Sequence, residues 1–165
     1  MEQDWMSEEE IEALQDIWEK VFKSAEDVGV IILVRLFTGH PASKQYFAMF
    51  KDLETADDLK ASAKLRWHAG RVMGSLDKAV RSLRNPEELI QILRAVGLSH
   101  ARQATPVDVK YYHILGGIIM DVLLETFKDE LSPTARGAWT KLLATLCTEF
   151  ENAYREEGVL EQAAA

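Results

Sequence analysis

Apolar residues along the chain recur at the three- and four-residue spacing of amphipathic helices, and the strict alternation typical of strands is missing. The first helix is predicted to begin after Ser7, because Ser7 and Glu10 have the form of a capping box, and to run to about residue 23. A second predicted helix, at about 26–38, is apolar on nearly all sides and stops at His40 and Pro41, since the residue before proline disfavours helix. A helix of this composition is expected to be buried on several sides.

The rest of the chain continues the helical pattern. A short turn of helix and an irregular stretch are predicted over 42–59, and a helix follows at about 61–83. Asn85 and Pro86 form a cap with a proline in the first turn, so the next helix is predicted to run to about residue 101. Two long helices are predicted at about 107–128 and 133–156, the second capped by Ser132 and stopped by Gly158. The predicted fold class is all-α.

Length, charge and cysteine content narrow the possible classes of protein. The 165 residues suffice for a single domain, predicted over 1–165 with a helical core at about 8–157 and short frayed termini that include 161–165. The formal net charge of −8 argues against nucleic acid and anionic membrane surfaces as partners. Cys147 is the single cysteine, which excludes an intramolecular disulfide and fits a reducing compartment. Neither a membrane span nor a signal peptide is recognisable, so a cytoplasmic, soluble protein is expected.

Two histidines carry the candidate chemistry, because His68 and His100 each lie on the apolar stripe of a predicted helix. The residues on those stripes are Leu65, Val72 and Leu76 around His68, and Leu93, Val96 and Gly97 around His100. Two imidazoles are therefore expected to point inward from helices joined by a short connection around 84–86. A haem iron would explain both, because imidazole is a good axial ligand and an apolar pocket controls access to the metal.

A structural role for these histidines remains an alternative, since a lone histidine on an apolar helix face is more often a core or boundary residue. The coincidence of two such positions beside small residues, Ala69 and Gly97 among them, favours ligation, because small side chains let a flat cofactor approach the backbone. His40 and His113 lie in a turn and beside tyrosines, and for them the structural interpretation is retained.

Other residues gain interest from their position near the two histidines. Phe47 and Phe50 could be ordinary core aromatics, but their place on an irregular segment just before the His68 helix favours a wall of the pocket. Arg71 would normally be solvated, whereas near a haem its guanidinium could meet a propionate carboxylate. There is no phosphate-binding glycine loop, zinc-binding cysteine pair or nucleophile elbow, so no catalytic residue is assigned.

Taken in order, these residues resemble the globin family over nearly the whole chain, from about Ile11 to Tyr154. The segments that carry the resemblance are 26–30, 33–35, 42–47, 71–74, 111–115 and 138–142. The resemblance implies a globin fold of about seven to eight helices around a haem pocket, with His100 as the proximal and His68 as the distal ligand of the iron. The predicted cofactor-binding residues are, besides the two histidines, Leu33, Phe47, Phe50, Arg71, Val72, Val96, Val107, Tyr111, Tyr112 and Leu115.

The function implied by the resemblance is reversible binding of dioxygen, carbon monoxide and nitric oxide, as in oxygen storage or transport. The cofactor is expected to be haem b, iron protoporphyrin IX, because no Cys-x-x-Cys-His motif for covalent attachment exists. Without a gas ligand both histidines are expected to bind the iron, since the irregular stretch at 51–60 gives the His68 helix room to slide. The alternative is a haem enzyme, a nitric-oxide dioxygenase or nitrite reductase, which would need a cellular reductase as partner.

Overall fold

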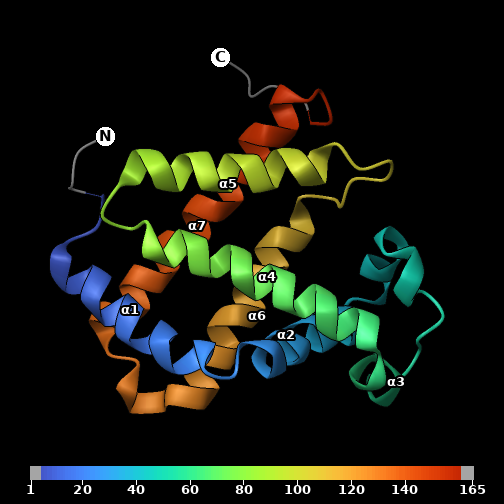
Figure 1. Ribbon diagram of the computed structural model, residues 1–165, viewed down its shortest axis with the longest axis horizontal. Coiled ribbons are helices and arrows are strands. Elements are labelled where there is room, and N and C mark those ends of the chain that lie inside the picture. Colours follow the sequence, from blue (N-terminus) through green and yellow to red (C-terminus); the bar gives the residue numbers. More distant parts are fainter. Residues whose placement is uncertain (1–4, 161–165) are drawn as a thin grey trace.

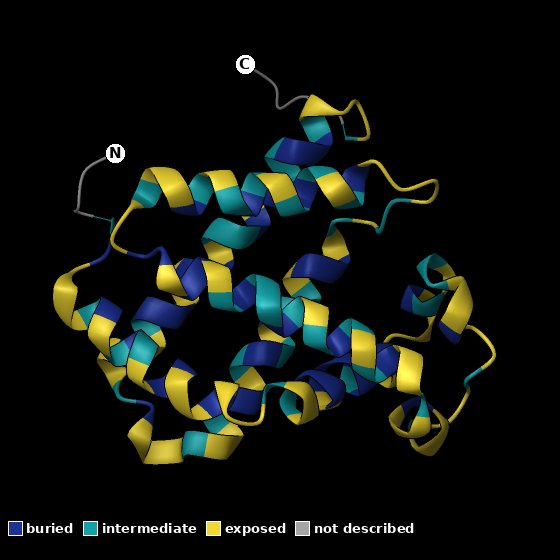
Figure 2. Ribbon diagram, viewed as in Figure 1, coloured by how far each residue is buried: buried dark blue, intermediate teal, exposed yellow. Residues whose placement is uncertain are grey.

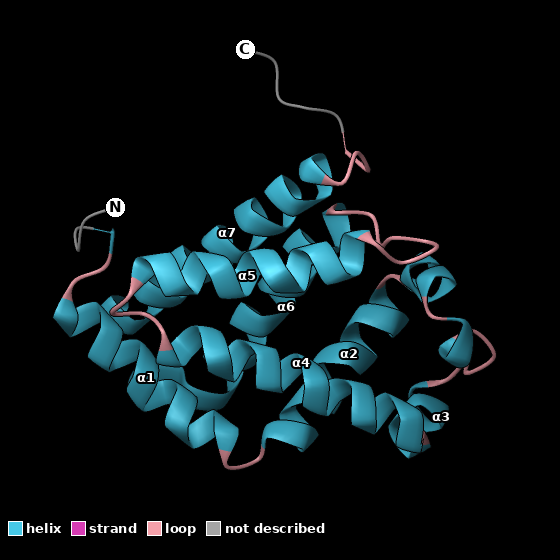
Figure 3. Ribbon diagram, turned by 45° about the horizontal axis from the view of Figure 1, so that its top comes forward, coloured by secondary structure: helices cyan, strands magenta, loops and turns pink. Residues whose placement is uncertain are grey.

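The computed structural model describes residues 5–160, and every regular element in that range is a helix (Figures 1 and 3). The seven α-helices of this part of the chain are α1 Glu8–Phe22, α2 Ala25–Gly39, α3 Ala56–Ala61, α4 Ala63–Arg81, α5 Pro86–Ala101, α6 Lys110–Phe127 and α7 Pro133–Glu156. Three short 3₁₀ segments accompany them: η2 Pro41–Tyr46, η3 Ala48–Phe50 and η4 Lys128–Glu130. The predicted all-α class is thus confirmed. The frayed end predicted at 161–165 lies outside the described residues.

The helix ends follow the signals in the sequence. The capping box at α1 is complete, because the Glu10 amide donates to Ser7 Oγ at 3.1 Å and the Ser7 amide to Glu10 Oε1 at 2.9 Å. Asn85 and Ser132 accept backbone hydrogen bonds at the starts of α5 and α7. After α7, Gly158 has a φ of 75°, the left-handed conformation that glycine adopts most easily. These predicted boundaries are confirmed.

The prediction of an irregular stretch over 51–60 is wrong in its second half. Helix α3 begins there at Ala56, and the Thr55 hydroxyl accepts a hydrogen bond from the Asp58 amide at 3.0 Å. Leu59 anchors the helix, since its side chain is fully buried. Ser62 then ends α3 and caps α4 in turn, so only a single residue separates the two helices. Helix α6 also starts later than predicted, at Lys110.

Helices α4 and α5, which carry the two histidines, lie side by side, and α6 and α7 cross behind them (Figures 1 and 3). Buried residues face the space between these layers and exposed residues face outward (Figure 2). The larger of two apolar core clusters surrounds Trp139 and Leu142 of α7, and the smaller one joins Phe37, Phe50 and Leu59. Within residues 5–160, no helix has both the length and the apolar character needed to cross a bilayer.

Helix α4 is seated against α2 at a glycine. A Cβ atom at Gly29 would lie 2.9 Å from Met73 Cγ and 3.0 Å from Ala69 Cβ. Only glycine permits so close an approach of the two helices. Because Ala69 follows His68 directly, this crossing determines the position of the His68 backbone.

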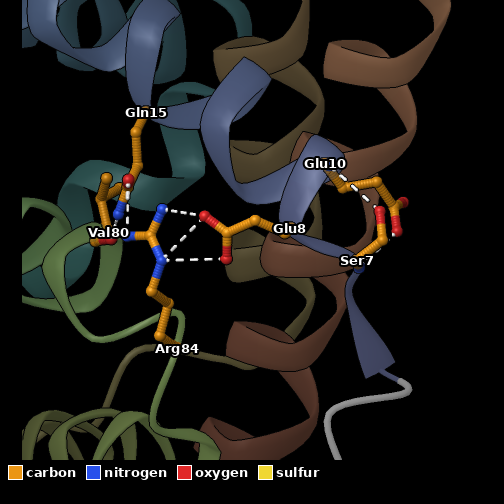
Figure 4. A network of polar contacts seen from close by, with 6 residues as sticks. All are labelled: Ser7, Glu8, Glu10, Gln15, Val80 and Arg84. Carbon is orange, nitrogen blue, oxygen red and sulfur yellow. Dashed lines mark hydrogen bonds and ion pairs between the residues drawn. The ribbon is translucent and has the colours of Figure 1, made fainter.

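A polar network holds the connection between α4 and α5 against α1 (Figure 4). The Arg84 guanidinium donates to both carboxylate oxygens of Glu8 and, through Nη1, to Gln15 Oε1 at 3.1 Å. Gln15 Nε2 in turn donates to the Val80 carbonyl oxygen at 2.9 Å. The corner between the two histidine-bearing helices is therefore tied to the first helix of the chain.

Candidate functional site

His100 is held in one orientation near the end of α5. Its Nδ1 lies 2.8 Å from the Val96 carbonyl oxygen, and a carbonyl can only accept, so Nδ1 carries the proton. The ring stacks on Phe150 at a centroid distance of 5.8 Å and an interplanar angle of 27°, and it meets Tyr112 edge-on at 5.9 Å. The lone pair is therefore on Nε2. A hydrogen bond of this kind is the usual support of a metal-binding histidine.

His68 faces the same region from α4. It is half-buried and meets Phe47 edge-on at 5.5 Å and Phe50 at 6.1 Å. Burial lowers the pKa of His68 most, and electrostatic interaction with the nearby His100 and Arg71 lowers it further. The neutral imidazole is thus favoured, which is the form with a lone pair available for a metal.

Both imidazoles line one cleft with a volume of about 660 Å³. Three further residues of the predicted pocket, Phe47, Arg71 and Val107, line it as well. At its rim Trp67 is 61 % exposed, and the Arg71 guanidinium lies 5.0 Å above the Trp67 ring. The cleft therefore has an aromatic wall, two imidazoles and a cationic rim.

A second, smaller cavity of about 90 Å³ lies deeper, between α4, α5, α6 and α7. Four residues of the predicted pocket line it: Val72, Val96, Tyr112 and Leu115. His100 also lines it, and is the residue that the two cavities share. The side chains around this cavity are almost all apolar, so the site is apolar inside and has polar side chains such as Arg71 at its mouth.

The remaining predicted pocket residues lie behind these cavities. Leu33 and Phe50 are buried in the smaller core cluster, and Phe50 reaches the site through its contact with His68. Tyr111 is also buried, and its ring packs edge-on against Tyr46 at 5.8 Å. None of the three lines either cavity.

The structure adds residues from α7 that the sequence analysis did not assign to the site. Leu143, Leu146 and Phe150 line the inner cavity, and Phe150 contacts His100 directly. Their helical spacing is visible in the sequence and marks a buried face. It does not indicate which other helix that face covers.

A buried tyrosine pair connects α6 and α7 to the cleft. Tyr154 donates to the Val107 carbonyl oxygen at 2.7 Å, so its own oxygen accepts from the Tyr112 hydroxyl at 2.8 Å. Burial raises the pKa of Tyr112, which keeps this donor protonated. The pair fixes the segment that carries Val107 beneath the cleft.

The other histidines and the cysteine have structural surroundings. His40 is exposed in a turn, and His113 is exposed with Nε2 3.4 Å from a Glu151 carboxylate oxygen. Cys147 is buried, and burial raises its pKa to about 11, with the Glu151 charge as a smaller cause.

The thiol of Cys147 is accordingly expected to be inert in the folded protein. At pH 8 a pKa of about 11 leaves roughly one thiol in a thousand ionised, and only the thiolate attacks a disulfide reagent. An aromatic disulfide reagent should therefore react slowly with the native chain and rapidly after denaturation. Dithiothreitol should leave unchanged the kinetics of the gas binding expected from the sequence; a thiol-dependent change would instead indicate an intermolecular disulfide through Cys147.

The donor set fits a haem better than a bare metal ion. Within the described residues no group of three histidine, cysteine or acidic side chains could hold a metal ion. Two imidazoles are too few for a bare ion, whereas a haem supplies four ring nitrogens of its own. The apolar inner cavity and the Arg71 rim match a flat cofactor with an apolar body and carboxylate edge.

The chain is similar to known proteins over most of its length. Residues 30–150 match the globin family. Cytoglobin-1 of Oryzias latipes is 42 % identical over 153 residues, which cover 93 % of this chain and 86 % of that protein. Cytoglobin-2 of Danio rerio is 39 % identical over 88 % of this chain and 80 % of its own length, and Globin-1 of Mordacia mordax is 37 % identical over 90 % and 93 %. The similarity therefore covers both histidine-bearing helices.

Proposed function

This chain belongs to the globin family, and from that premise we propose that it binds one haem b between α4 and α5, with His100 as proximal and His68 as distal ligand. Its function as a globin is to bind haem and, through it, gaseous ligands such as dioxygen. The observation that carries the finer proposal is the convergence of two supported imidazoles on one cleft.

The proposed roles follow from the contacts of each residue. The Val96 carbonyl holds the His100 ring so that Nε2 is free to bind iron. Val72, Val96 and Leu115 line the inner cavity with apolar surface and so keep water from the metal. Arg71 at the cleft rim would pair with a propionate. When bound, the haem supplies an iron centre at which a diatomic gas can bind reversibly.

We propose that His68 is the sixth ligand when no gas is present. The support is its place in the cleft that His100 also lines, together with a lowered pKa that favours the neutral imidazole. The aromatic contacts of His68 with Phe47 and Phe50 involve no hydrogen bond that would have to break. Val72 and Phe47 have no side-chain donor, whereas the His68 imidazole can donate a hydrogen bond to a gas in the pocket.

Visible absorbance of the purified full-length protein tests this function. Ferric, ferrous and gas-exposed samples should each show a haem Soret band, and the ferrous sample should show the split visible bands of low-spin, six-coordinate iron. Reversible spectral changes with carbon monoxide and dioxygen complete the test. A chain that takes up no haem would contradict the proposal.

Removing the haem should lower the stability of the protein. A ligand that binds only the native fold stabilises it by about 2.7 kcal/mol at a hundred times its dissociation constant. The largest change is expected in α5, because its inward face would border an empty cavity. Hydrogen exchange should show faster exchange over 87–101 in the haem-free protein than in the holoprotein. Equal protection in both forms would contradict a haem contact with α5.

A haem enzyme is the second candidate, acting on nitric oxide as a dioxygenase or on nitrite as a reductase. The feature that favours it is the accessible mouth of the cleft, where Met49 is 54 % and Trp67 61 % exposed and a reductase could approach. Stopped-flow mixing of the gas-bound protein with nitric oxide, under a cellular reductant, tests it. Turnover beyond one equivalent per haem would favour the enzyme; a single stoichiometric reaction favours gas binding.

We also propose that the whole chain forms one globin domain located in the cytoplasm. The single buried thiol supports that location, because it is compatible with a reducing compartment.

A further inference from the structure

Helices α5 and α7 approach each other at Gly97 more closely than any side chain would allow. A Cβ atom placed on Gly97 would lie 2.9 Å from Ala153 Cβ and 3.1 Å from Phe150 Cα. Real Cβ atoms essentially never come within 3.0 Å of such a neighbour. The second contact is with backbone, which cannot rotate out of the way as a side chain can. A larger residue at this position would therefore have to separate the two helices.

The same crossing places an aromatic ring under His100. Phe150, whose Cα lies beneath Gly97, stacks its ring on the His100 imidazole at 5.8 Å. Tyr112 meets the Phe150 ring edge-on at 4.9 Å and also contacts the His100 ring. Gly97 and His100 are three residues apart, so they share a face of α5. The distance between the helices at Gly97 thus sets how His100 rests on Phe150.

Gly97 has no local conformational reason to be glycine. It lies inside α5 with helical backbone, where glycine weakens a helix relative to alanine. Because Gly97 has no Cβ atom, α5 can pack closely against α7, and this packing offsets the cost.

We propose that Gly97 is a positioning residue for the iron ligand. By allowing α5 to rest on α7, it sets the height and tilt of the His100 imidazole in the cleft. The role of Gly97 toward iron rests on the proposed function, whereas its effect on the His100–Phe150 stack does not require haem. Protein interiors are close-packed, so separation of α5 and α7 moves His100 with its helix.

Gly97→Ala in the full-length holoprotein tests the proposal. The iron–histidine stretch is enhanced in resonance Raman spectra of five-coordinate ferrous haem, so it is recorded in the His68→Leu background. There the band should shift relative to His68→Leu alone, because the imidazole is displaced from the position set by Phe150. Adding Ala153→Gly to this variant removes the 2.9 Å contact and leaves the 3.1 Å contact with Phe150 Cα, so the band should return part of the way. The matched control is Gly117→Ala on α6, since a Cβ there meets nothing within 4 Å.

A second readout does not depend on haem. The ring current of Phe150 should displace the His100 imidazole proton resonance of the wild-type chain, and Gly97→Ala should reduce that displacement. If the single variant does not fold, both measurements are made on the Gly97→Ala/Ala153→Gly protein. Its Raman band and its imidazole resonance should then show a partial shift. An unshifted band and resonance in a folded Gly97 variant, or an equal shift in Gly117→Ala, would overturn the proposal. A wild-type chain that binds no haem would overturn the proposed function, and the imidazole resonance would still decide the role of Gly97.

Discussion

Replacement of His100 by alanine is expected to abolish stable haem binding. The variant loses the imidazole whose Nδ1 is held by the Val96 carbonyl and whose ring rests on Phe150. Residues that merely orient a metal ligand account for about 10- to 100-fold in metal affinity, so loss of the ligand itself should exceed roughly a hundredfold. Haem content by pyridine haemochrome, together with titration of haem into the refolded chain, measures the effect.

His113→Ala is the matched control for this substitution. His113 is an exposed histidine on α6 whose nearest charged partner is Glu151, so its loss should leave the Soret band and the haem content of the protein unchanged. The circular dichroism of both variants reports whether the helices are retained. Wild-type haem content and spectrum in His100→Ala would show that the iron is held elsewhere.

Replacement of His68 by leucine is expected to convert the ferrous protein from six- to five-coordinate iron and to speed carbon monoxide binding. An internal ligand reduces apparent affinity by the fraction of protein in the open state, so a histidine bound about 99 % of the time costs about a hundredfold. Leucine keeps an apolar contact with Phe47 and Phe50 and cannot ligate iron. Flash photolysis or stopped-flow mixing with carbon monoxide gives the association rate.

The same substitution should weaken the retention of bound dioxygen, although it speeds the association of carbon monoxide. Dioxygen should leave His68→Leu faster than wild type, because the hydrogen-bond donor on the distal side is gone. His40→Leu, in an exposed turn away from the cleft, should change neither rate. A wild-type ferrous protein that is already high-spin and five-coordinate would refute bis-histidine ligation, and a simple oxygen-storage role would then be the better interpretation.

Most helices could be located from the sequence because their signals are local. The apolar period and the caps at Ser7, Asn85 and Ser132 depend only on residues within a turn of each other, so they survive in the fold unchanged. Helix α3 was missed because its six residues are too few for a clear apolar period. Its start was nevertheless marked by Thr55 and Asp58, whose spacing is that of a side-chain cap.

The candidate site likewise combines features that local sequence determines with features that depend on the tertiary structure. The sequence by itself determined that His68 and His100 lie on inward helix faces, because a helical period specifies which residues share a face. It left open which faces meet, since that depends on how helices far apart in the chain cross. Only the tertiary structure brought Phe150 of α7 beneath His100, joined the two histidines in one cleft, and moved Leu33 and Tyr111 behind it. The closeness of those crossings depends on glycines such as Gly97, whose role is visible only when the opposing helix is in place.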